Sequence, residues 1–327
     1  MRSRRARAAA TWIGLAVTLV LAYFAVRGVQ AGEVWDAIRE SNPWWLLPAF
    51  AAFAAAIFLR AYRWQLLFVP ALRPPLHVVW KAVLVGYFFN SVLPARAGEV
   101  ARVVYLNRRA AASHAQSAAT VVLERSYDVL TLLLLFFVAL PWLPEVSWVQ
   151  AAGVLGIAVA AGLLVAGAAA LRWRGRPVRA LMRPFVRRGL VSRERVDESV
   201  ELLKHGLAGI TRPGTAAGVA LWTTASWIAL SLSNWLLMLG FDLGLSPVAG
   251  LLVSVAVGVA MVLPASPAAL GAFEAATVVA LDAYGVPRSE ALSYALVLHA
   301  LNLVPFLVAG PIALRAGTGR VALREVR

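Results

Sequence analysis

The 327-residue sequence contains no cysteine, and charged residues make up only 14% of it. The absence of thiols excludes cysteine nucleophiles, thiolate zinc sites, iron–sulfur clusters and any disulfide framework. A typical soluble protein has about 25% charged residues, so the usual charged surface is missing as well. Hydrophobic residues reach 61% of the chain, which is more than one globular core can bury. The composition therefore indicates an all-α polytopic membrane protein.

Lysine is nearly absent, because only Lys81 and Lys204 occur in the chain. The 31 basic residues are thus almost all arginines, and with 16 acidic residues they give a net charge of +15. No basic stretch is interleaved with aromatic residues in the manner of a stacking platform, and we expect no nucleic-acid partner. Basic loops at the cytoplasmic face of a membrane account for the charge.

Apolar runs of membrane-spanning character recur along the chain, since a transmembrane helix needs about 20 mostly apolar residues. Six clear spans are predicted at 11–26, 44–68, 118–140, 148–171, 216–239 and 291–314. Two further stretches, 76–94 and 247–283, are interrupted by Pro, Gly and charge. The first has basic residues on both flanks, so it must enter and leave on one side, as a re-entrant hairpin or tight helix pair. Such broken backbone is tolerated only where protein buries it or where it lines a wet cavity.

The distribution of charge predicts which segments face the cytoplasm. Arginine-rich segments are expected inside the cell, and these are 1–10, the loop 172–215 and the tail 315–327. Segments that are acidic on balance are expected outside, and these are 28–43, 141–147 and 282–290. We therefore expect a multi-pass protein of the cell (inner) membrane with both termini in the cytoplasm. The first span is interpreted as a retained anchor rather than a cleaved signal peptide.

The order span, span, hairpin, span occurs twice, in residues 1–140 and again, inverted, in residues 141–314. The first membrane repeat holds the cytoplasm-side hairpin 76–110, and the second holds the basic loop 172–215 and the outer-side hairpin 247–283. Both hairpins contain Val-Gly and then Val-Leu-Pro. Inverted repeats with discontinuous helices are an architecture of secondary transporters. The alternative is chance similarity between apolar segments of low complexity.

Several charges lie within predicted membrane segments: Arg96, Glu99, Arg102, Glu124, Arg125, Asp128 and Glu274. Each costs about 2.5–3.5 kcal/mol on insertion scales, so a lipid-facing position is disfavoured. Glu124 and Asp128 share one helical face by their spacing. One interpretation is a buried ion-pair network, for instance Arg96 or Arg102 with Glu124 or Asp128. The other is an anion or headgroup site gripped by the arginine fork, and both can hold together.

Other polar residues are weaker signals. Asn90, Asn234, His299 and Asn302 are expected to form hydrogen bonds between helices, with proton coupling open for His299. Arg60 and Arg63 are expected to snorkel to the inner interface. The segment 178–191 mixes apolar residues with arginines and predicts an interfacial amphipathic helix, followed by a short polar helix at 192–210.

Two groups of residues resemble a known family. The first is Asn90-Ser91-Val92-Leu93-Pro94-Ala95-Arg96-Ala97-Gly98-Glu99 with Arg102, Glu124, Arg125 and Asp128, and the second is Pro264-Ala265-Ser266-Pro267 with Leu270-Gly271-Ala272-Phe273-Glu274. The chain is similar over most of its length to the flippase-like membrane domain of lysylphosphatidylglycerol synthases. The resemblance implies a lipid or lipid-linked substrate moved between leaflets. Because only 315–327 follow the last predicted span, we expect a stand-alone member without the aminoacyl-transferase domain. This chain departs from it by having Ala268-Ala269 in place of Gly-Gly, which predicts a stiffer hairpin, and His299 where an Arg is usual.

We expect a translocase for an anionic or zwitterionic headgroup rather than an enzyme, with membrane lipids (anionic phospholipid or polyprenyl-linked substrate) as partners, no cofactor, no metal, and possible homo-oligomers. The alternatives are a membrane-embedded glycosyl- or aminoacyl-lipid transferase and a non-catalytic scaffold. Expected substrate-binding residues are Asn90, Arg96, Glu99, Arg102, Glu124, Arg125, Asp128, Glu274 and His299. Expected structural hinges are Pro94, Gly98, Pro264, Pro267 and Gly271.

Cysteine scanning tests the predicted topology, because the chain has no native cysteine. In sealed right-side-out cells, a cysteine at Glu33 or Glu145 is expected to react with a membrane-impermeant maleimide. A cysteine at Ser113 or Ser192 is expected to react only after permeabilisation. Labelling of position 192 from outside would overturn the orientation.

Overall fold

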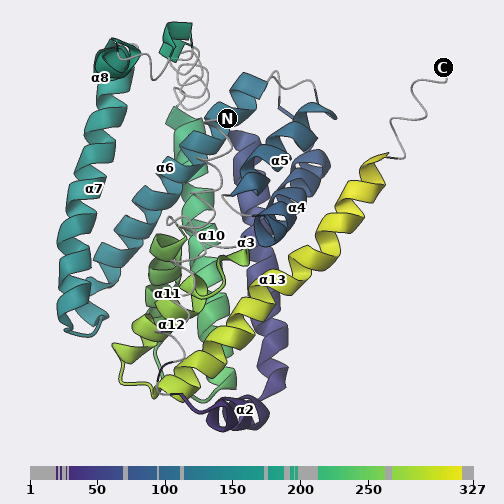
Figure 1. Cartoon of the computed structure of the whole chain (residues 1–327), viewed down its shortest axis with the longest axis vertical. Helices are drawn as coiled ribbons and strands as arrows, with labels where there is room; N and C mark the ends of the chain where they lie inside the picture. The colour runs from purple at the N-terminus through teal and green to yellow at the C-terminus, as the bar shows by residue number, and fades with distance from the viewer. Residues whose placement is uncertain are drawn as a thin grey trace.

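The computed structural model describes residues 20, 23, 27, 29–68, 73–93, 96–110, 114–172, 176–187, 192–194, 196–197, 213–261 and 267–318. All regular structure within these ranges is helical (Figure 1). The predicted first span at 11–26 lies outside them apart from positions 20 and 23, as do most of the predicted helix 192–210 and the hinge residues Pro94 and Pro264.

Among the described residues, three helices are long and apolar enough to cross a membrane: α3 (Leu46–Leu66), α10 (Pro213–Gly240) and α13 (Arg288–Thr318). They match the predicted spans 44–68, 216–239 and 291–314. Two further helices of 26 residues each, α6 (His114–Ala139) and α7 (Ser147–Arg172), occupy the predicted spans 118–140 and 148–171. The chain is thus a multi-pass helical membrane protein, in which α3 and α10 pack together along their length.

The two interrupted stretches form pairs of short helices. In the first, α4 (Leu76–Val92) packs on α5 (Ala97–Asn107). In the second, α11 (Pro247–Ala260) packs on α12 (Ala272–Asp282), and the short 3₁₀ helix η4 (Pro267–Ala269) lies between them. The pairs occupy opposite halves of the bundle (Figure 1), and α4 contacts η4 where their tips meet. The relation of the two halves by an inverted repeat stays a prediction.

Glycine allows the first hairpin to close tightly. The Gly98 N–H donates a 2.9 Å hydrogen bond to Oδ1 of Asn90, across the connection between α4 and α5. A Cβ at Gly98 would overlap the carbonyl oxygen of Gly86 and the Asn90 side chain. The predicted hinge at Gly98 is therefore a point of backbone contact between two helices, and Asn90 is the side chain that satisfies its N–H.

The second hairpin turns through left-handed backbone. Ala268 and Ala269 both have φ of 56°, and Gly271, which precedes α12, has φ of 80°. Left-handed backbone costs a non-glycine residue roughly 1–2 kcal/mol. This cost gives a physical reason for the Gly-Gly of the resembling family, and the stiffer hairpin expected from the two alanines stays a prediction.

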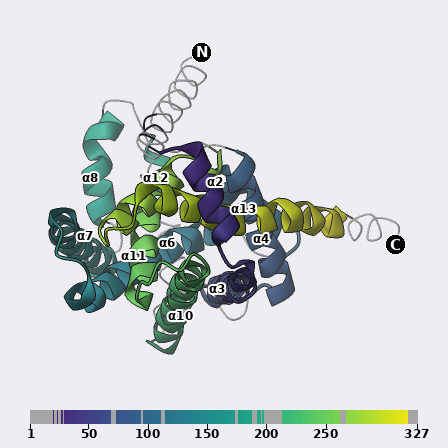
Figure 2. The ribbon, with the colours of Figure 1, turned by 90° about the horizontal axis from the view of Figure 1, so that it is seen from below.

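The remaining helices cap the two ends of the bundle. The amphipathic α2 (Ala31–Glu40) lies at one end and contacts α13, where the Ser293 hydroxyl donates to the Val34 carbonyl. The short 3₁₀ helix η1 (Pro43–Trp45) leads directly into α3, and η3 (Leu140–Trp142) follows α6 on the way to α7. The helix α8 (Arg176–Arg187) lies at the other end (Figure 1) and confirms a helix in part of the predicted segment 178–191, whose interfacial position stays a prediction. The helix α7 stands at the edge of the bundle against α6 (Figure 2). Which end faces the cytoplasm stays a prediction.

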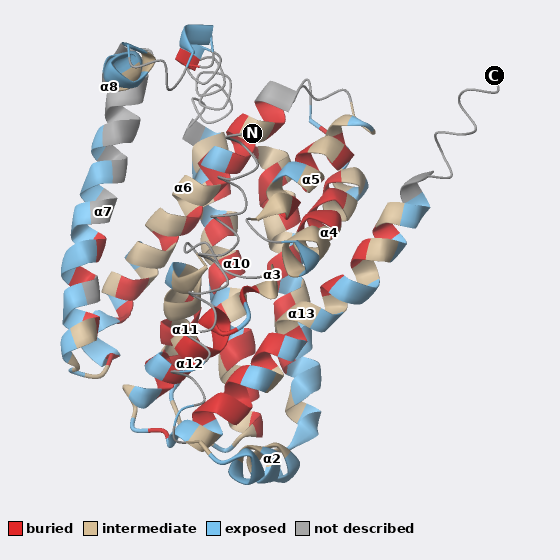
Figure 3. Cartoon of the chain, viewed as in Figure 1, coloured by how far each residue is buried: buried red, intermediate tan, exposed pale blue. Residues whose placement is uncertain are grey.

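Burial follows the interior of this arrangement (Figure 3). Buried side chains concentrate where α3, α4, α10, α12 and α13 meet, and include Trp64, Leu106, Leu281 and Tyr294. Large apolar side chains point outwards from α10, α13 and α7, as for Leu221 and Ile312. An exposed apolar surface of this kind suits contact with lipid tails.

Replacement of Gly98 by Ala is expected to lower the stability of the protein by about 1–3 kcal/mol, because the added methyl meets backbone that cannot rotate away. A matched control is Gly162→Ala in α7, where a Cβ would meet nothing within 4 Å. Melting in detergent should therefore shift down for Gly98→Ala only. Equal melting temperatures for the two variants would contradict the close approach of α4 and α5.

Candidate functional site

A buried arginine on α3 connects two acids on α6. The Arg63 side chain is 0% exposed, and its Nη2 lies 2.8 Å from Oε1 of Glu124 while its Nη1 contacts Oδ1 of Asp128. The Thr223 hydroxyl on α10 accepts a further hydrogen bond of 3.3 Å from Nη1. The snorkelling predicted for Arg63 is therefore wrong, because two carboxylates one turn apart on α6 attract its guanidinium inwards.

A second arginine neutralises the same acid from the other side. Nη1 of Arg102 on α5 lies 2.9 Å from Oε2 of Glu124. Its guanidinium stacks 4.6 Å from the ring centre of Trp64, whose indole N–H donates to the Thr120 hydroxyl at 2.9 Å. The predicted pairing of Arg102 with Glu124 is confirmed, and Glu124 is buried between two guanidinium groups.

A half-exposed layer of charge covers this buried core. Nε of Arg125 lies 3.0 Å from Oε1 of Glu99, and its Nη1 lies 3.4 Å from Oδ2 of Asp128. Arg96 approaches Glu99 at 3.9 Å, not Glu124, because Arg96 lies at the start of α5 one turn before Glu99. The side chains of Arg96 and Arg125 are each 40% exposed and that of Glu99 is 25% exposed.

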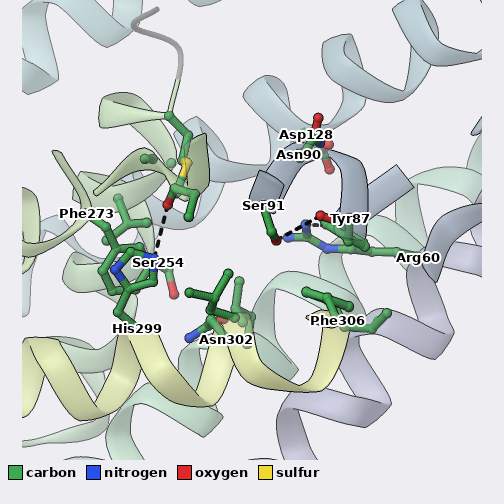
Figure 4. A pocket seen from close by; sticks show the side chains of 18 of the residues that line it. Arg60, Tyr87, Asn90, Ser91, Asp128, Ser254, Phe273, His299, Asn302 and Phe306 are labelled. Atoms are coloured by element: carbon green, nitrogen blue, oxygen red, sulfur yellow. Dashed lines mark hydrogen bonds between the residues drawn. The ribbon is translucent and has the colours of Figure 1, made fainter. Parts of the chain in front are cut away.

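These charges line a cavity of about 540 Å³ between the tips of the two hairpins (Figure 4). Of the nine predicted binding residues, six line it: Asn90, Arg96, Glu99, Arg125, Asp128 and His299. The other three do not line the cavity. Arg102 and Glu124 pair with each other behind the charged wall, and Glu274 contacts the lining residue His299. Much of the remaining wall is apolar, with Phe53, Ile57, Leu132, Leu230, Val257 and Leu303.

Arg60 is a lining residue that the sequence did not predict as part of a site. Its Nη1 donates to the Tyr87 hydroxyl at 3.1 Å, and its guanidinium lies 4.4 Å from the ring centre of Trp227. The indole N–H of Trp227 in turn donates to Oδ1 of Asp128 at 3.1 Å. The spacing of Arg60 and Arg63 as i and i+3, opposite the paired acids of α6, is the sequence signal that could have indicated this role.

Glu274 and His299 form a second polar centre on the opposite wall. Nδ1 of His299 lies 2.6 Å from Oε1 of Glu274, and Nε2 lies 3.1 Å from the Ala268 carbonyl (Figure 4). The other oxygen of Glu274 accepts the Gly271 N–H at 2.7 Å, and the Phe273 ring stacks on the imidazole at 4.4 Å. A carbonyl only accepts, so the contact with Ala268 suits a hydrogen on Nε2, while Nδ1 faces the carboxyl group of Glu274.

The two hairpins share a local pattern. Glu99 and Glu274 each occupy the third position of the second helix of their hairpin, after Arg96 and Gly271 respectively. Each carboxylate contacts a nitrogen-bearing side chain on the following long helix, Arg125 or His299, which is 26 or 25 residues further along the chain. This correspondence concerns the two carboxylates and their partners alone, and the inverted repeat stays a prediction.

The remaining predicted polar residues act within the helix bundle. Asn234 donates to the Ser254 hydroxyl at 3.0 Å and to the Gly250 carbonyl at 3.2 Å, so its predicted role between helices is confirmed. Asn302 instead donates to the Leu298 carbonyl of its own helix at 2.8 Å. Pro267 begins η4 and Gly271 precedes α12, and their role as hinges stays a prediction. Within the described ranges, no group of three or more His, Asp or Glu side chains could hold a metal ion.

Comparison with known proteins identifies a family whose model covers most of the chain. Residues 11–310 match the family described as "Lysylphosphatidylglycerol synthase TM region". The chain is also similar to a protein of Haloferax volcanii named "Glycosyltransferase AglD", with 25% identity over 341 residues that cover 95% of this chain. They cover 55% of that protein, so the chain spans about half the length of this curated relative.

Replacement of Arg63 by Met should destabilise the protein by about 3–5 kcal/mol, because it leaves buried carboxylates with too little positive charge. Arg96→Met, which removes a half-exposed guanidinium, should cost less than about 1 kcal/mol. The double variant Arg63→Met with Asp128→Asn should recover part of the loss. Thermal melts of the three variants in detergent test this, and a wild-type melting temperature for Arg63→Met would refute the buried network.

Proposed function

Because the chain belongs to the family of lysylphosphatidylglycerol synthase transmembrane regions, we propose that it is a lipid translocase. In this proposal it moves a lipid or lipid-linked substrate with an anionic or zwitterionic headgroup between the leaflets of the cell (inner) membrane. Both termini face the cytoplasm, and membrane lipids are its partners.

The observation that carries the proposal is the divided lining of the cavity. One part of the wall presents Arg60, Arg96, Arg125, Glu99 and Asp128, and much of the rest is apolar. A lipid has the same division between a polar headgroup and apolar tails. In the proposal the headgroup is held at the charged wall, where guanidinium groups bind phosphate oxygens through paired donors, and the tails remain among apolar side chains.

The position of the cavity also suits transport between leaflets. Its walls come from both helix hairpins, which approach from opposite halves of the bundle, and α13 contacts both α4 and α12. Transporters with discontinuous helices bind their substrate where such elements meet, and they expose it alternately to the two sides. We infer that rearrangement of the hairpins opens the cavity to each leaflet in turn.

The second candidate is a membrane-embedded transferase, which the name of the H. volcanii relative favours. Such an enzyme needs a general base near its substrate. Glu124 is unsuited, because both of its oxygens lie in ion pairs with arginine, whereas Glu99 lines the cavity and pairs through a single oxygen. Turnover of a labelled lipid-linked sugar or aminoacyl donor by the purified protein, lost in Glu99→Gln, would favour this candidate.

The test of the proposal is leaflet exchange in reconstituted liposomes. Liposomes with and without the purified protein would carry acyl-chain-labelled phosphatidylglycerol, lysyl-phosphatidylglycerol, phosphatidic acid or phosphatidylcholine, or a labelled polyprenyl phosphate. Protein-dependent exposure of inner-leaflet label to an external quencher or enzyme is expected for at least one lipid. Identical exchange in protein-free liposomes for the whole panel would count against a translocase.

Arg96 provides a specific prediction for this assay. Arg96→Ala should abolish most of the exchange, because it removes a guanidinium that lines the cavity, while the melting temperature stays near the wild-type value. Arg96→Lys keeps the charge but loses the two-donor fork, and should retain a reduced rate. Wild-type exchange by Arg96→Ala would remove Arg96 from the site.

A further inference from the structure

We propose that the charged wall of the cavity selects lipids that end in a phosphate group and excludes lipids with a cationic headgroup, and that Arg60 is the main phosphate-binding residue. This inference deepens the proposed function, on which it rests for the lipid nature of the occupant. Its evidence is the balance of charge around the cavity and the contacts of Arg60.

The arginines that line the cavity, or that pair with its buried acids, outnumber the carboxylates there. Five arginines face three carboxylates, which leaves an excess of two positive charges among the described residues: Arg60, Arg63, Arg96, Arg102 and Arg125 against Glu99, Glu124 and Asp128. On the opposite wall, Glu274 already has His299 and the Gly271 N–H as partners. An anion bound in the cavity would neutralise this excess positive charge.

The carboxylates near Arg60 are already occupied by other donors. Oδ1 of Asp128 accepts from Arg63 and from Trp227, and Oδ2 accepts from Arg125. Glu124 lies between Arg63 and Arg102. No described carboxylate lies within ion-pair distance of Arg60, and its Nε and Nη2 are buried without a hydrogen-bond partner in the described structure. Buried donors of this kind are costly unless a ligand satisfies them.

The groups in contact with Arg60 orient its guanidinium, and Asp128 attracts it without an ion-pair contact. The Tyr87 hydroxyl accepts from one Nη, and the ring of Trp227 covers the guanidinium at 4.4 Å. A cation held against an aromatic ring keeps its charge. Nε and Nη2 of Arg60 thus carry N–H groups without a protein acceptor, and the half-exposed Arg96 supplies a second cation on the same cavity.

Headgroup chemistry follows from this charge. A phosphomonoester headgroup carries between one and two negative charges near neutral pH and matches the excess of two positive charges. A zwitterionic headgroup brings no net charge, and an aminoacylated headgroup brings an ammonium group into a site that is already positive. Like charges in a confined site discriminate strongly between partners.

Binding measurements on the full chain in phosphatidylcholine nanodiscs test the selectivity. The probes are dihexanoyl phosphatidic acid, dihexanoyl phosphatidylcholine, a short-chain lysyl-phosphatidylglycerol and inorganic phosphate. Phosphatidic acid is expected to bind at least tenfold more tightly than the other three. Equal affinity for phosphatidic acid and the lysylated lipid would overturn the selectivity, and equal affinity for inorganic phosphate would overturn the assignment to a lipid.

Variants of Arg60 test the residue. Arg60→Gln should weaken binding of phosphatidic acid by about tenfold to a hundredfold, as expected for a lost charge-assisted contact. The matched control Arg39→Gln changes an arginine of α2 that stacks on Trp35 outside the cavity, and should bind as wild type. If Arg60→Gln does not fold, Arg60→Lys serves, with severalfold weaker binding and retained exclusion of the lysylated lipid. Unchanged binding in a folded Arg60 variant would overturn its role.

The liposome assay separates this inference from the proposed function. Selective binding of phosphatidic acid that depends on Arg60, without leaflet exchange of any lipid, would support the anionic site and refute the translocase. Exchange of the lysylated lipid as fast as phosphatidic acid, with no effect of Arg60→Gln on either, would support the translocase and overturn the anionic selectivity.

Discussion

The buried contact of Arg63 with Glu124 and Asp128 determines much of the site. This contact holds α3 against α6, and a further hydrogen bond from Arg63 to Thr223 connects α10 to the same pair of helices. Removing two carboxylates and a guanidinium from water is costly, so the arrangement persists only with all partners present. Because Arg63 and Arg102 both form ion pairs with Glu124, the arginines that line the cavity have weaker ion-pair partners. The ions that stabilise the fold and those that could bind a ligand are therefore parts of one network.

Much of the architecture could be predicted from the sequence. The apolar runs gave the long helices to within a few residues at most of their ends, and the Pro, Gly and charge in two of those runs indicated helix pairs rather than full spans. The spacing of Glu124 and Asp128 correctly placed both acids on one face of α6. These features depend on local periodicity and composition, which the sequence contains directly.

The partners of the charges were harder to predict. Arg63 contacts Glu124 and Asp128 across 61 and 65 residues of sequence, and an arginine near the end of an apolar run looks the same whether it faces lipid headgroups or the interior. Left-handed backbone at Arg96 and Ala268 was also unexpected, because such conformations normally require glycine. In each instance tertiary contacts, which local patterns do not report, determine the outcome.

The 2.6 Å contact between Nδ1 of His299 and Oε1 of Glu274 gives the cavity a property that its arginines lack. An arginine keeps its charge, whereas an imidazole can exchange a proton with a neighbouring carboxyl group. A proton moved across this contact would convert an ion pair into two neutral groups without changing their combined charge. The electric field beside His299 would then change while the charge balance at the arginine wall stays the same.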